Sequence, residues 1–342
     1  MKAVFIRGHG GPEVVEVGEL PEAEPGPGQV RLAVKAAAAN HLDLWVCRGW
    51  PGLKLSFPHV LGSDMSGVVE AVGPGVDAVK VGDAAVVYPG VSCGRCERCL
   101  SGEVNLCRRY AILGEHVSGV QSQKLVISAR NVFPKPARLG FEEAAAVPLT
   151  FLTAWHALVA RAGVKLGETV LVHAAGSGVG VAAVQIAKLL GARVIATAGS
   201  DAKLEKARAL GADEVVNYET GSFVDAVKKL TNRRGVDVVF EHVGKKTWEG
   251  SIQSATVGGR IVTVGATTGY DPLTDLRHVF FRQLSVLGST MGTPGELAQV
   301  LRFVEEGKLR PVVDRVLPMS DVKVAHQLLA ERAQFGKIVL TP

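Results

Sequence analysis

Residues 167–190 read GETVLVHAAGSGVGVAAVQIAKLL, and the order of residue types in this stretch decides the fold of the middle of the chain. The apolar run 169–172 predicts a strand, the small residues of 174–180 predict a tight turn, and 181–190 has the spacing of an amphipathic helix. A strand, a glycine-rich turn and a helix in direct succession are typical of the first βα unit of a nucleotide-binding fold.

This turn suits a pyrophosphate group. The first N–H groups of a helix carry a partial positive charge, and small residues let a phosphate approach the backbone. The usual first and second glycines of the motif fall on Ala175 and Ser177, and only Gly180 matches cleanly. A structural turn that binds nothing is the alternative. The residues expected to contact the pyrophosphate are Gly176, Ser177, Gly178, Val179 and Gly180.

Length and composition limit the classes of protein that fit. A chain of 342 residues is too long for one ordinary core, so we expect two domains. The net charge of +5 is small for this length; it suits an anionic small ligand and does not indicate nucleic acid. The N-terminal sequence becomes polar after Ile6, unlike a signal peptide, and no apolar run is long enough to cross a membrane. We therefore expect a cytoplasmic protein.

The pattern changes near residue 150. Before it, predicted short strands alternate with glycine and proline turns; after it, strands and helices alternate, which predicts a doubly wound parallel sheet. Ser200 is placed to cap the helix 201–210, and a closing strand is predicted at 337–340. The six strands expected in the sheet are 169–172, 193–198, 214–217, 236–241, 260–264 and 285–288.

Four of the five cysteines lie in one short loop. Cys93, Cys96, Cys99 and Cys107 have the spacing C-x2-C-x2-C-x7-C, and four thiolates can close a tetrahedral Zn²⁺ site with no position left for substrate. One structural zinc per chain is therefore expected. Two disulfides or four unrelated thiols are the alternatives, and a reducing compartment disfavours disulfides. Cys47 stands apart and fits a small buried hydrophobe.

The order of these features resembles the medium-chain dehydrogenase/reductase superfamily, which includes zinc-containing alcohol dehydrogenases and quinone oxidoreductases. The likeness covers nearly the whole chain. The resemblance implies an α/β protein with a GroES-like β-rich catalytic domain, residues 1–149 and 290–342, and a Rossmann domain, residues 150–289, with the active site in the cleft between the domains. The segments that carry it are AANHLDLW, HVLGSDMSGVVEAVG, VPLTFLTAWHAL and VVFEHVG.

Departures from the family pattern point to the chemistry. The three ligands of the family's catalytic zinc fall on Asn40, Ser63 and Leu149, and only Asp64 keeps acidic character. Without that ion a simple alcohol is a poor substrate, because zinc is what makes deprotonation feasible near neutral pH. The resemblance therefore implies the zinc-free branch that reduces quinones or α,β-unsaturated carbonyls. Asn40, with the Ser63 hydroxyl, is expected to donate hydrogen bonds to the developing oxyanion. Trp50 and Leu149 would form apolar walls.

Asn40 has a second interpretation, a turn residue that caps the following helix.

The resemblance also assigns cofactor contacts. NAD enzymes of this fold have an acid at the end of the second strand, where this chain has Ala198. NADPH is therefore expected over NADH, although Lys203 alone would fit an ordinary solvated lysine. The residues near a 2′-phosphate would be Gly199, Ser200, Lys203 and Tyr218. The residues at the pyrophosphate would include His41 and Lys337, and those lining the nicotinamide Thr153, Val243, Val264 and Gly265.

Three other interpretations stay open, and the one that the cofactor-site residues disfavour most is a purely structural role. A zinc alcohol dehydrogenase with unusual ligands would draw on His41, His59 and Asp64. A non-catalytic NADPH- or RNA-binding protein is the second alternative, although no basic stripe interleaves with aromatic residues. Family analogy implies a homodimer or homotetramer and a small carbonyl, quinone or alcohol substrate.

Overall fold

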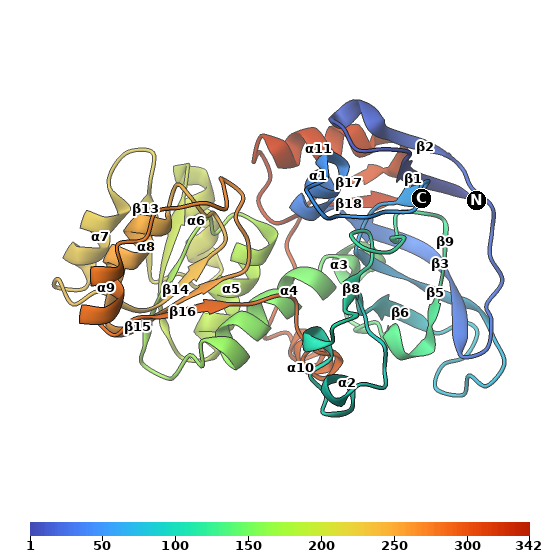
Figure 1. Cartoon of the computed structure of the whole chain (residues 1–342), viewed down its shortest axis with the longest axis horizontal. Helices are drawn as coiled ribbons and strands as arrows, with labels where there is room; N and C mark the ends of the chain where they lie inside the picture. Colours follow the sequence, from blue (N-terminus) through green and yellow to red (C-terminus); the bar gives the residue numbers. More distant parts are fainter. The chain divides into compact units, whose positions relative to one another are not determined.

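The computed structural model describes all 342 residues and divides them into two compact units (Figure 1). The first unit comprises Met1–Leu149 and Thr293–Pro342, and the second comprises Thr150–Gly292. The two chain ends therefore belong to the same unit. No helix is both long and apolar enough to span a membrane.

The second unit is built on a six-stranded parallel sheet, which confirms the predicted doubly wound fold. The strand order is β13-β12-β11-β14-β15-β16, with the first strand in sequence, β11, in the middle. The fifth strand begins at Ala255 rather than at residue 260. The strands are β11 (Thr169–Val172), β12 (Arg193–Ala198), β13 (Glu214–Asn217), β14 (Val236–Glu241), β15 (Ala255–Thr263) and β16 (Ser285–Gly288).

Helices cover both faces of this sheet. Leu171 in β11 shares a buried cluster with Val227 and Ile252, whereas Val170 and Val172, which point the opposite way, are also fully buried. Figure 1 shows α7, α8 and α9 side by side along one flank. The helices are α4 (Pro148–Trp155), a π-helical continuation (His156–Arg161), α5 (Gly178–Leu189), α6 (Asp201–Ala209), α7 (Phe223–Leu230), α8 (Trp248–Ser254) and α9 (Leu276–Phe281).

The first unit contains a larger, mostly antiparallel sheet with strand order β10-β6-β5-β3-β18-β17, and β9 also pairs with β3. A second sheet has the order β2-β1-β4, and β7 pairs with β8. The strands are β1 (Lys2–Ile6), β2 (Val15–Glu19), β3 (Gln29–Ala38), β4 (His59–Val60), β5 (Asp64–Val72), β6 (Ala84–Val87), β7 (Gly90–Val91), β8 (Ala111–Ile112), β9 (Lys124–Ser128), β10 (Val132–Pro134), β17 (Val313–Pro318) and β18 (Lys337–Thr341). The helices are α1 (His41–Arg48), α2 (Glu97–Leu100), α3 (Phe141–Ala145), α10 (Pro294–Glu305) and α11 (Val322–Ala330).

The end of the chain completes the larger sheet. Strand β18 pairs antiparallel with β3, so that Val339 lies opposite Ala38, and it pairs parallel with β17. Figure 1 shows these C-terminal strands, in red, beside the blue strand β3. Strand β17 was not predicted, because its side chains are mostly half-buried or exposed and give no apolar alternation. This pairing brings the start of β18 next to the end of β3, where Asn40 follows.

Candidate functional site

The glycine-rich turn joins β11 to α5 as predicted, but the helix begins at Gly178 rather than at residue 181. Ser177 is the N-cap residue, and its hydroxyl accepts a hydrogen bond from the Gly180 N–H at 3.0 Å. A Cβ atom at Gly180 would lie 2.5 Å from the carbonyl oxygen of Ala174. Gly180 is therefore required for the helix to pack against the preceding turn, which is what the third glycine of a dinucleotide-binding motif does.

The end of β12 holds the residues expected near the 2′ position of a cofactor. Tyr218 lies against Gly199, where an added Cβ would be 3.0 Å from the phenolic oxygen. Helix α6 has Ser200 as its N-cap residue, at the predicted position, but the Ser200 hydroxyl makes no capping hydrogen bond. The first acidic residue after the strand, Asp201, accepts a hydrogen bond from the Asn217 amide at 2.8 Å. Strand β12 thus ends without an acidic side chain of its own.

Three of the four residues expected at the nicotinamide lie near the ends of β14 and β15, and the fourth, Thr153, lies in α4. The Val243 N–H donates to the Glu241 carboxylate, and the Val264 N–H donates to the Glu241 carbonyl at 2.9 Å. The Gly265 carbonyl accepts a hydrogen bond from the Thr263 hydroxyl. The hydroxyl of Thr153, a residue of α4, lies 3.7 Å from the Met291 sulfur. Val243, Val264 and Gly265 therefore belong to two turns at one edge of the sheet.

A buried polar cluster in the first unit joins residues from three distant parts of the chain. The Lys337 ammonium donates to the Asn40 amide oxygen, and to the Asp64 carboxylate at 2.9 Å. The Asn40 nitrogen donates to Asp64 at 2.9 Å and to the Ala38 carbonyl at 3.3 Å. Lys337, Asn40 and Asp64 are exposed by 4%, 6% and 0%. Their hydrogen bonds compensate the cost of burying an ion pair.

A second carboxylate extends this cluster. Asp43, at the start of α1, accepts hydrogen bonds from the Asn40 N–H at 2.9 Å and from the Gln121 amide at 3.1 Å. Its other oxygen has no partner, and burial raises the pKa of Asp43 to about 6. The cluster thus contains two buried carboxylates and one ammonium group, and the Asp64 carboxylate is the one that contacts the ammonium directly.

The three positions that the resemblance assigns to catalytic-zinc ligands do not fit a metal. The Asn40 oxygen is taken by Lys337, and the Ser63 hydroxyl donates to the Leu113 carbonyl at 2.7 Å. The Leu149 backbone N–H donates to Asp64 at 2.6 Å, and its side chain offers no ligand atom. A divalent cation beside Asp64 would also meet the Lys337 ammonium, which carries charge of the same sign.

The remaining predicted residues of the first unit are His41, Trp50 and Lys337. His41 is the first residue of this helix, and its ring meets Trp45 edge-on with centroids 5.3 Å apart. Trp50 follows the helix, and its side chain is 39% exposed. This partial exposure is compatible with the predicted role of Trp50 as an apolar wall of an open pocket. Lys337 was expected at the pyrophosphate, but its ammonium donates hydrogen bonds to Asn40 and Asp64. To contact a pyrophosphate, the ammonium would have to break these hydrogen bonds.

The four cysteines of the predicted zinc loop converge. All four sulfur atoms lie within 4.8 Å of one another, with Cys93–Cys99 at 3.8 Å and both Cys96–Cys99 and Cys93–Cys107 at 3.6 Å. A regular tetrahedron with Zn–S bonds of about 2.3 Å has sulfur atoms about 3.8 Å apart. The spacing of the sulfur atoms therefore matches a tetrahedral thiolate site.

Backbone donors around this cluster favour a thiolate at Cys93, whereas burial and the hydrogen bonds from the other sulfur atoms raise the pKa of Cys96 to about 11. The backbone N–H groups of Arg95 and Cys96 lower the pKa of Cys93 to about 5. The Arg109 N–H donates to the Cys107 sulfur at 3.3 Å. Arg95 and Arg109 line the same surface hollow as Cys93, so two basic residues lie beside the cysteine loop.

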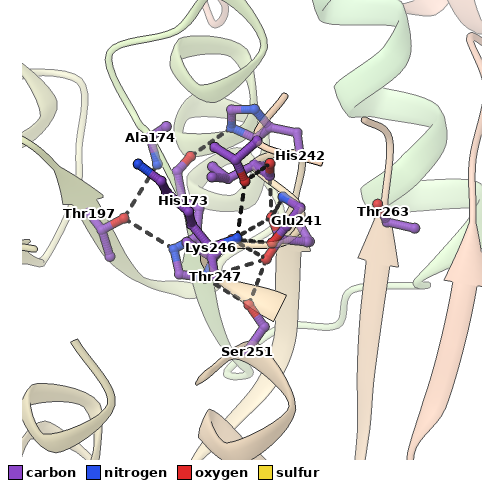
Figure 2. A network of polar contacts seen from close by, with 12 residues as sticks. His173, Ala174, Thr197, Glu241, His242, Lys246, Thr247, Ser251 and Thr263 are labelled. Carbon is purple, nitrogen blue, oxygen red and sulfur yellow. Dashed lines mark hydrogen bonds and ion pairs between the residues drawn. The ribbon is translucent and has the colours of Figure 1, made fainter. Parts of the chain in front are cut away.

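A buried network in the second unit was not predicted. Glu241 ends β14 and is fully buried, and it is linked through Ser251 to His173 at the end of β11 (Figure 2). Its sequence signal is a glutamate directly after the apolar residues 238–240, at the end of a predicted buried strand. A charge in that position needs several partners, which sequence reasoning did not pursue.

Known proteins match both units of the chain. A family model described as zinc-binding dehydrogenase matches residues 178–306, and one described as alcohol dehydrogenase GroES-like domain matches residues 26–137. The chain is 32% identical to the acryloyl-coenzyme A reductase of Metallosphaera sedula, with 100% of both proteins covered. It is 32% identical to the quinone oxidoreductase of Pseudomonas aeruginosa, with 100% of this chain and 99% of that protein covered.

A solved structure described as an NAD-dependent alcohol dehydrogenase is 57% identical, with a TM-score of 0.97 and both chains covered in full. These three relatives thus carry three different substrate names.

Proposed function

Because this chain belongs to the medium-chain dehydrogenase/reductase superfamily, whose enzymes depend on NAD(P), we propose that it transfers a hydride between a nicotinamide and a quinone or α,β-unsaturated carbonyl compound. The observation that carries the proposal is the buried Lys337 ammonium on Asn40 and Asp64. The resemblance assigns Asn40 to one of the three ligand positions of the catalytic zinc of alcohol dehydrogenases, and Asp64 to the acidic residue near them. The names of the two relatives at 32% identity support the same class of substrate.

The proposed chemistry needs no metal to make an alkoxide. When bound, NADPH would supply a hydride for addition to the β-carbon of the conjugated acceptor or to the quinone. A proton from solvent then completes the reduction at the α-carbon or at the quinone oxygen. The protein's part is to hold the reactants in line and to stabilise charge on the substrate oxygen.

Asn40 and Ser63 are the proposed donors to that oxygen. In the structure the Asn40 nitrogen donates to Asp64 and Ala38, and the Ser63 hydroxyl donates to Leu113. A substrate oxygen would therefore have to replace one of these internal acceptors. We assign Asp64 to positioning, since it holds Lys337, the Asn40 amide and the Leu149 N–H together.

We propose one structural Zn²⁺ per chain, held by Cys93, Cys96, Cys99 and Cys107, and a reducing, cytoplasmic environment that keeps these thiols free. With four protein ligands the ion would leave no coordination position for substrate. Its contribution would be to fold the loop around α2 rather than to take part in the reaction.

We propose NADPH as the preferred cofactor. Strand β12 ends at Ala198 without an acid for the ribose 2′-hydroxyl, while Ser200, Lys203 and Tyr218 lie just beyond it. The test is the ratio of kcat/KM for NADPH and NADH, with Lys203→Ala as the diagnostic variant and Lys206→Ala on the same helix as its control. We expect NADPH to be favoured and only Lys203→Ala to reduce the ratio. A ratio that favours NADH in the wild type would overturn this preference.

Turnover assays test the reaction itself. The protein is mixed with NADPH and either 1,4-benzoquinone or 2-cyclohexen-1-one, and loss of nicotinamide absorbance is followed; ethanol with NAD⁺ or NADP⁺ is the comparison. Each assay is run with and without added Zn²⁺. We expect turnover of at least one conjugated acceptor that added zinc does not increase. Turnover of ethanol alone, dependent on added zinc, would refute the proposal.

Alcohol dehydrogenase activity is the second candidate. It is favoured by the 57% identical structure described as an NAD-dependent alcohol dehydrogenase. This function predicts ethanol or aldehyde turnover with NAD(H), and a second metal held by residues outside the four-cysteine loop. Metal content and substrate range together separate the two candidates.

We propose a homodimer or homotetramer that associates through the second unit. Strand β16 is an edge of the sheet, so one side of it has unpaired backbone groups, and Phe280 and Phe281 in α9 are 59% and 74% exposed. A second copy would cover both features. Phe281→Glu should lower the mass measured by light scattering, whereas Leu166→Glu, which changes a leucine that is 84% exposed elsewhere in the unit, should not. A monomeric wild type would contradict the proposal.

A further inference from the structure

Glu241 is the centre of the buried network at the carboxyl edge of the second unit's sheet (Figure 2). One carboxylate oxygen accepts from the N–H groups of Val243 at 2.7 Å and Gly244 at 3.0 Å. The other accepts from the hydroxyls of Ser251 at 2.7 Å and Thr247 at 2.8 Å. These four donors compensate the charge in a site that water does not reach.

An ionised carboxylate can only accept hydrogen bonds, and this fixes the direction of every bond that follows. Ser251 must donate to Glu241, so its oxygen accepts from Nε2 of His173, 3.0 Å away. Burial lowers the pKa of His173, so the ring is neutral and its Nδ1 is an acceptor. Thr197, 3.2 Å from Nδ1, therefore donates to the ring. The Thr197 oxygen remains as acceptor for the Ala174 N–H at 3.3 Å.

The chain of bonds ends on a strained residue. Ala174, the first residue of the glycine-rich turn, has φ of +43°, in the left-handed region that residues other than glycine rarely adopt. Thr197 holds it from both sides, because its hydroxyl accepts from Ala174 and its carbonyl accepts from the Ala175 N–H at 2.8 Å. Such a conformation persists only where the surroundings enforce it, and it is common at ligand-binding sites.

The same carboxylate orders a second turn. Val243 and Gly244 follow Glu241 directly, and the Val243 carbonyl accepts from the Thr268 N–H and hydroxyl, both at 2.7 Å. The His242 ring also donates to the His173 carbonyl at 2.8 Å, which joins the ends of β14 and β11 directly. Ligands of open α/β sheets bind at the carboxyl ends of the strands, where these turns lie.

We propose that Glu241 is a positioning residue for the nicotinamide cofactor, acting through Ser251, His173 and Thr197 on the glycine-rich turn and through Val243 and Gly244 on the turn after β14. This inference rests on the proposed function, since it requires the second unit to bind a nicotinamide dinucleotide at these turns. We call Glu241, Ser251, His173 and Thr197 the hydrogen-bond relay. The family resemblance assigns none of these four residues to the cofactor.

The test compares two substitutions that remove the same kind of hydroxyl. Thr197→Val breaks the relay and keeps the side-chain shape. Thr231→Val is the matched control, because the Thr231 hydroxyl also accepts a backbone N–H, from Gly235 at 3.0 Å, and donates to a carbonyl, of Val227 at 2.7 Å, in the same unit. Thr197→Ser restores the hydroxyl. Each variant is measured for its NADPH dissociation constant, from nicotinamide fluorescence, for KM and kcat, and for thermal stability.

We expect Thr197→Val and Glu241→Gln to raise the dissociation constant and the KM for NADPH by about tenfold, with kcat at saturating NADPH within about threefold of wild type. Thr231→Val should lower the melting temperature about as much as Thr197→Val does, but it should leave cofactor binding unchanged. Thr197→Ser should bind NADPH as tightly as the wild type does. If Glu241→Gln does not fold, the NADPH affinities of Ser251→Ala, Thr197→Val and Thr197→Ser still test the relay.

Two results would overturn the inference in different ways. Unchanged NADPH affinity in Thr197→Val and Ser251→Ala, with a loss of stability like that of Thr231→Val, would show that the relay is only structural. A wild-type protein that binds neither NADPH nor NADH would remove the proposed function and this inference with it.

Discussion

Replacing Lys337 by methionine tests the buried cluster of the first unit most directly. The substitution removes the ammonium and keeps most of the apolar stem. The Asp64 carboxylate, which is fully buried, would then keep only the Asn40 amide and the Leu149 N–H as partners. An uncompensated charge would remain in a site that water does not reach.

The magnitude follows from this burial. Removing one partner of a buried ion pair costs about 3–5 kcal/mol in the free energy of unfolding, because the other charge stays buried without compensation. The double variant Lys337→Met with Asp64→Asn removes that remaining charge. It should therefore be about 1–3 kcal/mol more stable than Lys337→Met alone, so the two substitutions should be strongly non-additive.

The assay must report the first unit alone, since a chain with two units need not unfold in one step. Trp45 and Trp50 belong to the first unit, and Trp155 and Trp248 to the second. In a background with Trp155→Phe and Trp248→Phe, fluorescence in urea follows the first unit. A loss below about 1 kcal/mol for Lys337→Met, or additive effects of the two substitutions, would refute the buried ion pair.

Three further outcomes are expected. Metal analysis of dialysed protein should find one zinc per chain, and the Cys96→Ser variant should lose this zinc. Two zinc ions per chain would instead favour alcohol dehydrogenase activity. Asn40→Ala should reduce kcat by roughly 10- to 100-fold, because the proposed donor to the substrate oxygen is lost together with the shared partner of Lys337 and Asp64; unchanged turnover would show that Asn40 has no such role. Burial lowers the pKa of His326 from 6.5 to about 4, so the unfolded chain binds a proton on this residue at higher pH than the folded chain does. The free energy of unfolding should therefore fall by up to roughly 3 kcal/mol as pH drops from about 6.5 to 4, and His326→Leu should flatten this dependence in urea titrations; an equally steep curve in the variant would contradict it.

Much of the fold could be predicted because its signals are local. The strands β11, β12, β13, β14 and β16 were predicted with the bounds that the structure has, since each is a short run bounded by turn residues. Strand β17 was missed because its half-exposed side chains carry no periodic signal; its place is set by pairing with β18. The convergence of four cysteines follows from their short spacing in one loop.

The candidate sites show where local reasoning ends. Asn40 and Asp64 were selected from motifs, but their joint partner, Lys337, lies 297 residues from Asn40 in the chain. The bond between Ser251 and His173 spans 78 residues, and no motif predicted it.

The sequence by itself determined the α/β fold class, the superfamily, the glycine-rich turn and the cysteine loop, because each depends on residues a few positions apart. Only the tertiary structure decided that Lys337 contacts Asn40 and Asp64 and that Glu241 is linked to the glycine-rich turn. The physical reason is that a buried charge takes its partners from whichever strands and helices the folded sheet brings beside it, and neither side-chain period nor motif spacing encodes that choice.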